Sequence, residues 1–161
     1  MTYRILTVCL GNICRSPAAE AVIRAKAMQA GLAVEVDSAG TAAYHVGNPP
    51  HTQSAQAGAR RGYDVTGRGR QLRSEDFEAF DLIVTMDDSN LDNTLRLAPP
   101  GHHARVVPLM DFAGGGEVPD PWGKPDSAYE RMYDLIEVAA AGLVDELAAD
   151  QASGLRHDSA N

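Results

Sequence analysis

Short apolar runs alternate along this chain with longer stretches in which apolar residues recur every three or four positions. The short runs are rich in β-branched residues and predict strands at Tyr3–Val8, Val34–Ser38, Phe80–Met86 and Arg105–Leu109. The longer stretches have a helical period and predict helices from Ala18 to a stop at Gly31, at His51–Arg61, at Asp88–Leu97 and from Ser127 through Leu147. This alternation predicts a doubly wound α/β fold.

The order of these elements limits the topology. The first strand, first helix and second strand form a βαβ unit, for which parallel pairing with a right-handed crossover is expected. Pro108 has no N–H to donate, so the last strand is expected to end there or to lie at a sheet edge. The segments Gly40–Pro50 and Asp111–Pro125 are predicted as loops.

The chain has the size of one compact domain. Its 161 residues, 44% of them hydrophobic, suffice for one core. We place that domain at residues 1–150 and predict a flexible tail at 151–161. No apolar stretch approaches the ~18 residues that cross a bilayer, and Met1–Val8 lacks the pattern of a secretory signal. A cytoplasmic monomer with no membrane partner is expected.

Charge is divided unevenly along the chain, whose formal net charge is −8. Residues 1–73 hold nine Lys or Arg against four Asp or Glu, whereas residues 74–161 hold five against eighteen. This division indicates either two differently charged solvated faces or an N-terminal half that handles an anion. Nucleic acid is disfavoured as a partner, because the chain is acidic overall and has no basic stripe interleaved with aromatic residues.

Between the first predicted strand and helix lies the run CLGNICRSP, from Cys9 to Pro17. Ligands of doubly wound folds bind at the carboxyl ends of strands. A tight loop with Gly11 and Asn12 can turn several backbone N–H groups toward a phosphate, with the positive end of the following helix behind them. The same field favours the thiolate form of Cys9, and Arg15 can hold two phosphoryl oxygens. The loop therefore predicts a phosphate site with a cysteine nucleophile.

A cysteine and an arginine six residues apart also admit a simpler interpretation. In it Cys9 is an inert buried thiol in a tight turn and Arg15 points to solvent. The Gly-Asn and Ser-Pro pairs and the strand-to-helix context favour the phosphate site. Two cysteines alone make neither a disulfide scaffold nor a closed zinc site.

The chain resembles the low-molecular-weight protein tyrosine phosphatases. The run CLGNICRSP matches that family's signature, and further matching blocks follow in the expected order at Asp37–Thr41, Asp81–Asn90 and Asp120–Pro121. The resemblance covers about residues 3–147. It implies a three-layer α/β/α fold with a four-stranded parallel sheet and a phosphate loop between strand 1 and helix 1. It also implies hydrolysis of phosphotyrosine and aryl phosphates.

The resemblance implies roles for particular residues. Cys9 would form a phosphocysteine, and Asp120 would act first as acid and then as base for water. Without the resemblance, a turn-forming Asp120 is the favoured interpretation. Ser38, which could instead cap a strand, would support the loop together with Asn12 and Ser16. The phosphate would be bound by Leu10, Gly11, Asn12, Ile13, Cys14, Arg15 and Ser16.

The same resemblance places aromatic walls and a redox pair at the site. Tyr44 and Trp122 match wall positions of the substrate cleft, although Trp122-Gly123 replaces a common tyrosine pair and each could be an ordinary surface aromatic. Cys14 could form a reversible disulfide with Cys9 or could be a small buried residue. A histidine that supports the loop in many members would fall near Gly67, which has no side chain.

Neither a metal nor a cofactor is expected, since the five histidines lack metal-ligand spacing with carboxylates and read as surface or loop residues. An arsenate reductase on this fold usually needs further cysteines. A protein-arginine phosphatase would have Thr in place of Ile13. A non-catalytic protein that binds phosphoanions is the alternative from another class, and the trio Cys9, Arg15 and Asp120 argues against it.

Overall fold

The computed structural model of this protein describes residues 2–159, with side chains described for residues 2–153. Four parallel strands form one sheet in the order β2-β1-β3-β4. Their bounds are Tyr3–Cys9 for β1, Val34–Gly40 for β2, Leu82–Thr85 for β3 and Arg105–Pro108 for β4. The predicted four-stranded parallel sheet is therefore confirmed, with β4 at an edge as Pro108 required.

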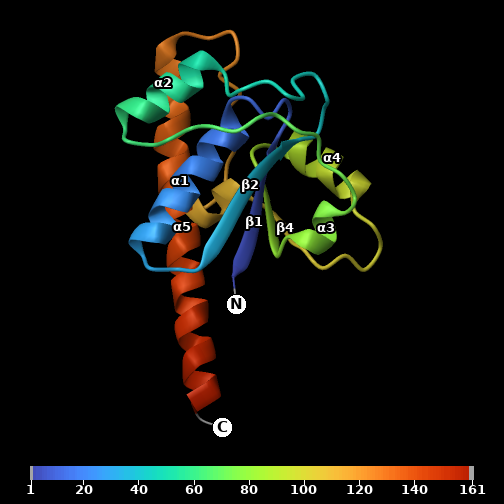
Figure 1. Cartoon of the computed structure of the whole chain (residues 1–161), viewed down its shortest axis with the longest axis vertical. Coiled ribbons are helices and arrows are strands. Elements are labelled where there is room, and N and C mark those ends of the chain that lie inside the picture. Colours follow the sequence, from blue (N-terminus) through green and yellow to red (C-terminus); the bar gives the residue numbers. More distant parts are fainter. Residues whose placement is uncertain (1, 160–161) are drawn as a thin grey trace.

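Helices cover both faces of the sheet (Figure 1). One face carries α1 (Arg15–Gln29), α2 (Thr52–Arg60) and the long α5 (Asp126–Ser159). The other carries the short α3 (Asp76–Ala79) and α4 (Asp88–Leu97). The result is the predicted three-layer α/β/α arrangement. Among residues 2–159, no helix is long and apolar enough to cross a membrane.

Alternation along β1 divides its side chains between two cores. Ile5 and Cys9 belong to the larger cluster beneath α1 and α5, whereas Leu6 and Val8 belong to the smaller cluster beneath α3. Successive side chains of a strand point to opposite faces, so this division follows from the period of two. The last residue of β1, Cys9, therefore faces α1, the helix that follows it.

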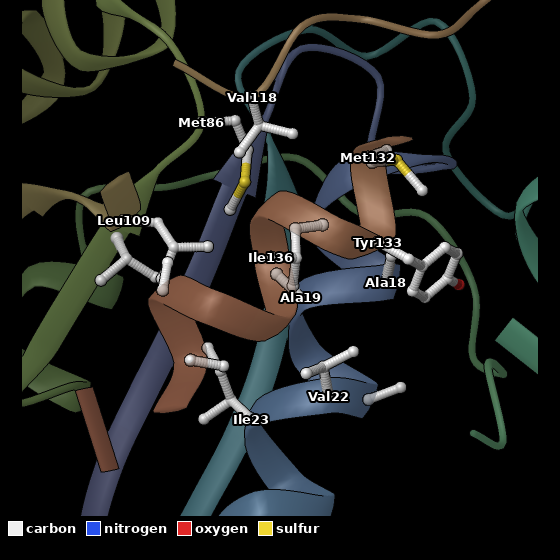
Figure 2. Close-up of a cluster of buried hydrophobic side chains, with 14 of the residues drawn as sticks. Ala18, Ala19, Val22, Ile23, Met86, Leu109, Val118, Met132, Tyr133 and Ile136 are labelled. Atoms are coloured by element: carbon white, nitrogen blue, oxygen red, sulfur yellow. The ribbon is translucent and has the colours of Figure 1, made fainter. Parts of the chain in front are cut away.

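The packing of α1 against α5 fills the larger core (Figure 2). Small residues of α1, such as Ala18 and Ala19, let the two helices approach, while Ile136 of α5 fills the space between them. All three side chains are 0% exposed. Burial of an aliphatic side chain the size of Ile136 stabilises the folded state by about 1.5 to 3 kcal/mol. This contact fixes where α1, and with it the loop before α1, lies on the sheet.

The structure adds elements that the sequence pattern did not reveal. A 3-10 helix, η1 (Leu109–Ala113), takes in Leu109, which was predicted to end the last strand, and the first residues of the predicted loop at 111–125. It ends at Gly114, whose φ of 90° is left-handed. Neither η1 nor α3 is long enough to show a helical period. The segment 151–159, predicted as part of a tail, continues α5; the flexibility of this segment stays a prediction.

Gly142 of α5 lies where the helix meets η1, and a Cβ atom there would overlap the carbonyl oxygen of Phe112. Gly142→Ala is therefore expected to lower the free energy of unfolding by about 1 to 3 kcal/mol, although alanine is the better helix former by about 1 kcal/mol. Urea denaturation measures the change. The control Ala141→Gly, at an exposed neighbouring position, is expected to cost only that propensity difference. A more stable Gly142→Ala variant would contradict the close contact.

Candidate active site

The loop between β1 and α1 occupies the carboxyl end of the sheet, beside the end of β2. Thr41 N–H donates to Cys9 O at 2.9 Å and Ala42 N–H donates to Leu10 O at 3.0 Å. At Gly40 an added Cβ would lie 2.7 Å from Leu10 O, so only glycine permits this approach. The Asp37–Thr41 block thus supports the loop through its backbone, a role that its side chains did not reveal.

Two donors surround the sulfur of Cys9, whose side chain is 3% exposed. Ser16 Oγ lies 3.0 Å from Cys9 Sγ, and the backbone N–H of Asn12 donates to the same sulfur at 3.3 Å. Hydrogen bonds to an anion stabilise the anion over its neutral form. The first turn of α1, which starts at Arg15, adds its positive end to the same place. The sulfur thus lies where two hydrogen-bonding groups and the positive end of a helix converge.

Asn12 sets the curvature of the loop. Its φ of 58° is left-handed, a conformation that asparagine tolerates better than most residues. Its side chain donates from Nδ2 to Ser16 Oγ at 2.8 Å and accepts at Oδ1 from the backbone N–H of Arg70 at 3.0 Å. Because Ser16 Oγ accepts the hydrogen bond from Asn12, its own proton is free to point at Cys9 Sγ. The chain thus brings Asn12, Ser16 and Cys9 together.

Ser38 is placed differently from Asn12 and Ser16. Its side chain is 8% exposed, but among the described side chains we find no hydrogen bond from its hydroxyl to the loop. One cavity of about 320 Å³ lies behind the loop instead, and it is bordered by Ser38, Asn12 and Gly67. On this side of the loop Asn12 is held instead by the backbone N–H of Arg70. A backbone donor cannot be recognised from the type of residue that carries it.

Arg15 is almost fully buried, at 3% exposed, and is held by residues that follow β3 and η1. Its Nη1 donates to Asp87 Oδ2 at 2.6 Å and to Val118 O at 3.0 Å. Asp87 is itself fixed as the N-cap of α4, because its Oδ1 accepts from Asn90 N–H at 2.7 Å. Neither Asp87 nor Val118 was among the predicted site residues. The position of Asp87, just after β3 in the Asp81–Asn90 block, is the signal that points to it.

Asp120 lies over the other end of the guanidinium. Its Oδ2 is 3.8 Å from Arg15 Nη2, and its carboxylate is 45% exposed. Oδ1 accepts from the backbone N–H of Trp122 at 3.1 Å, which orients the carboxylate within a loop flanked by two prolines. The backbone N–H of Val118 in turn donates to Met86 O at 2.8 Å and fastens this loop to the end of β3.

The side chains of Cys9, Arg15 and Asp120 border one cavity of about 530 Å³. The predicted wall residues Tyr44 and Trp122 are 75% and 52% exposed at its mouth. The histidine nearest the cavity, His45, lies in a loop, one of the two placements predicted for the histidines. Its ring lies 5.7 Å from that of Trp122 and it borders the cavity, which the sequence did not reveal. The lining comprises Cys9, Leu10, Gly11, Ile13, Cys14, Arg15, Tyr44, His45, Asp120 and Trp122.

Cys14, the second cysteine of the loop, borders the same cavity in a buried position. Both cysteines are free thiols in the structure. Burial raises the pKa of Cys14 to about 12, and the neighbouring Cys9 acts in the same direction. A thiol with a raised pKa is protonated below that pKa, so Cys14 is neutral at physiological pH. The two cysteines of this loop are thus in different surroundings.

Comparison with known proteins places these features in a family. Residues 4–153 match the family model described as low molecular weight phosphotyrosine protein phosphatase. A Streptomyces coelicolor low molecular weight protein-tyrosine-phosphatase is 40% identical over 152 residues, covering 89% of this chain and 93% of that protein. The Schizosaccharomyces pombe low molecular weight phosphotyrosine protein phosphatase is 42% identical over 141 residues, covering 83% and 90%.

A solved structure shows the same arrangement of the backbone. The crystal structure of a protein tyrosine phosphatase from Entamoeba histolytica superimposes with a TM-score of 0.88 at 36% identity, covering 92% of this chain and 99% of that one. The matches in sequence and in structure both extend over nearly the whole chain, including the loop from β1 to α1 and the Asp120 loop. This chain belongs to the low molecular weight phosphotyrosine protein phosphatase family.

Proposed function

We propose that this protein hydrolyses phosphotyrosine and small aryl phosphates through a covalent phosphocysteine on Cys9. The observation that carries the proposal is one cavity bordered by a sulfur, a guanidinium and a carboxylate, those of Cys9, Arg15 and Asp120. They are a nucleophile, a clamp for phosphoryl oxygens and a proton donor. Membership of the family supports the same chemistry.

In the first step the phosphate dianion binds the inward-facing N–H groups of residues 10–16 at the start of α1. Arg15 contributes Nη2, because Nη1 is already held by Asp87 and Val118. Cys9 Sγ then forms a bond to phosphorus as the bond to the leaving oxygen breaks. Asp120 donates its proton to that oxygen.

In the second step a water molecule attacks the phosphocysteine. Asp120, now a carboxylate at the mouth of the cavity, takes a proton from this water as the oxygen bonds to phosphorus. The bond to Cys9 breaks, and Ser16 Oγ together with Asn12 N–H stabilises the departing thiolate. Asn12 and Ser16 keep the loop in shape, while Tyr44 and Trp122 flank the aryl group.

We infer that a single chain acts alone, because every proposed catalytic group comes from one chain. Its catalytic unit ends near residue 150, since Leu147 is the last buried residue of α5 among the described side chains. Two free cysteines suit the reducing cytoplasm. Phosphotyrosine proteins are the proposed physiological partners.

The direct test is hydrolysis of p-nitrophenyl phosphate in the presence of EDTA. The parent protein is expected to turn over without metal, because N–H groups and Arg15 neutralise the phosphate. Cys9→Ser, which replaces the thiolate by a hydroxyl, is expected to lose all measurable turnover while still binding inorganic phosphate. Phosphate binding by the parent without turnover would instead support the non-catalytic alternative.

Asp120→Asn tests the proton donor. The variant keeps the shape of the side chain but cannot donate a carboxylic proton, so kcat/KM for phenyl phosphate, which covers the steps up to release of the phenol, is expected to fall about 100- to 1000-fold. The loss should be smaller for p-nitrophenyl phosphate, because its leaving group needs less protonation. Steady-state kinetics with both substrates measure the two ratios. Equal losses on both substrates would argue for a structural role of Asp120.

We propose that Cys14 protects the nucleophile by forming a reversible disulfide with it. Peroxide would convert the Cys9 thiolate to a sulfenic acid, and the Cys14 thiol would condense with it and release water. With its pKa raised to about 12, Cys14 stays protonated and escapes the first oxidation.

Dithiothreitol is therefore expected to restore activity after mild peroxide treatment of the parent protein. Cys14→Ser should be inactivated at a similar rate and recover less than a tenth of its activity, because its sulfenic acid is open to further oxidation. Activity before and after reduction measures this recovery, and free-thiol titration follows the disulfide. Equal recovery in the two proteins would rule out the protective disulfide.

A further inference from the structure

A second and wider groove adjoins the catalytic cavity. The two share Leu10 and Tyr44, which form the wall between them. The groove is open to solvent and spans about 1290 Å³. It is bordered by three segments: 41–44 after β2, 71–75 before α3, and the end of α4. Its charged lining residues are Arg73, Glu75 and Arg96. The mechanism uses none of these three.

Backbone pairing places the groove close to the phosphate loop. The end of β2 lies beside the loop through Ala42 N–H and Leu10 O. Next to it, Leu72 N–H donates to Gly40 O at 2.7 Å, and Gly40 N–H donates to Arg70 O at 2.9 Å. The spacing between neighbouring paired backbone segments, counted twice from the loop to residues 70–72, amounts to about 10 Å. An extended peptide covers this distance in about three residues. A side chain three residues from a bound phosphotyrosine can therefore reach the groove.

The arginines of the groove differ from most arginines of this protein. Within residues 2–153, seven arginines form ion pairs with carboxylates: Arg4, Arg15, Arg24, Arg60, Arg61, Arg70 and Arg105. In that same part of the chain we find no ion pair for Arg73 or Arg96, and both are exposed.

Arg96 Nη1 only donates to the neutral Asn93 Oδ1, at 3.3 Å. In a chain of net charge −8, two guanidinium groups without carboxylate partners on one groove are an anion-binding feature. Glu75 is the one carboxylate in the groove lining. The lining is thus positive overall.

We propose that this groove binds acidic side chains that flank phosphotyrosine in the protein substrate, within about three residues of it. The proposal rests on the proposed function, because it extends the same substrate beyond the catalytic cavity. Phosphotyrosine fills the cavity, the chain crosses the wall at Leu10 and Tyr44, and its Asp or Glu side chains pair with Arg73 and Arg96. Exposed ion pairs are individually weak, so the groove selects among substrates and speeds their capture without tight binding.

Two phosphotyrosine peptides test this recognition. One carries Glu at the three positions on each side of phosphotyrosine, and its control carries Gln at those positions. The parent protein is expected to show a kcat/KM about 3- to 10-fold higher for the Glu peptide, from two exposed pairs. This preference should fade as salt is raised to about 0.5 M, where screening is strong.

The double variant R73Q/R96Q is expected to lose the preference and to leave kcat/KM for the Gln peptide unchanged. Hydrolysis of p-nitrophenyl phosphate, which has no flanking residues, should also stay the same. The matched control is R131Q, which removes an exposed arginine of α5 for which we find no ion pair in residues 2–153; it should keep the preference. Glu75→Gln removes the opposing carboxylate and should raise the preference about twofold.

The outcomes separate this proposal from the proposed function. Turnover of p-nitrophenyl phosphate without any preference between the peptides would overturn the groove proposal alone. A preference that survives in R73Q/R96Q, or that is lost equally in R131Q, would also overturn it. If p-nitrophenyl phosphate is not hydrolysed at all, the proposed function fails. The groove is then judged by binding of the two peptides to Cys9→Ser, where equal dissociation constants would overturn it.

Discussion

The site depends on the inward curl of the backbone between β1 and α1. A loop this short can turn its N–H groups toward one point only if one residue takes a left-handed conformation, and Asn12 does so with a φ of 58°. The cost of that conformation is offset locally, because the Asn12 side chain bonds to Ser16 on one side and to the backbone of Arg70 on the other. The sulfur of Cys9 then lies at the focus of donors already in place.

The rest of the fold holds the two ends of this curl. The packing of α1 against α5 positions the helix whose positive end faces the loop. Asp87 at the start of α4 and the carbonyl of Val118, which packs in the same core as α1 and α5, hold the guanidinium of Arg15. Groups supplied from both layers of helices thus converge at one edge of the sheet. Because they are fixed before substrate arrives, little reorganisation is needed during the reaction.

Much of this arrangement could be predicted from the sequence. The strands and the main helices show clear hydrophobic periodicity. The run from Cys9 to Pro17 has the residue types that a phosphate loop with a cysteine nucleophile requires. The supporting contacts were less visible for physical reasons. Val118 and Arg70 act through backbone atoms, so their residue types carry no information. Asp87 is one of many carboxylates, and only the register of β1 and β3 brings it to Arg15.

The elements that the sequence did not reveal share one property. Both α3 and η1 are shorter than two turns and take their stability from packing rather than from periodicity. His45 was likewise predicted only to lie at the surface or in a loop, because nothing in the sequence shows that its loop brings it to the cavity beside Trp122. Local pattern identifies long elements, whereas tertiary contacts decide the short ones.

The long α5 has a consequence for handling the protein. Beyond Leu147 the helix continues to Ser159, about 18 Å further along its axis, and Figure 1 shows it leaving the body at the end of the sheet opposite the phosphate loop. An affinity tag or a surface linker joined after this helix would stand clear of the mouth of the cavity. The protein can thus be immobilised through its C-terminus with the reactive edge facing solution.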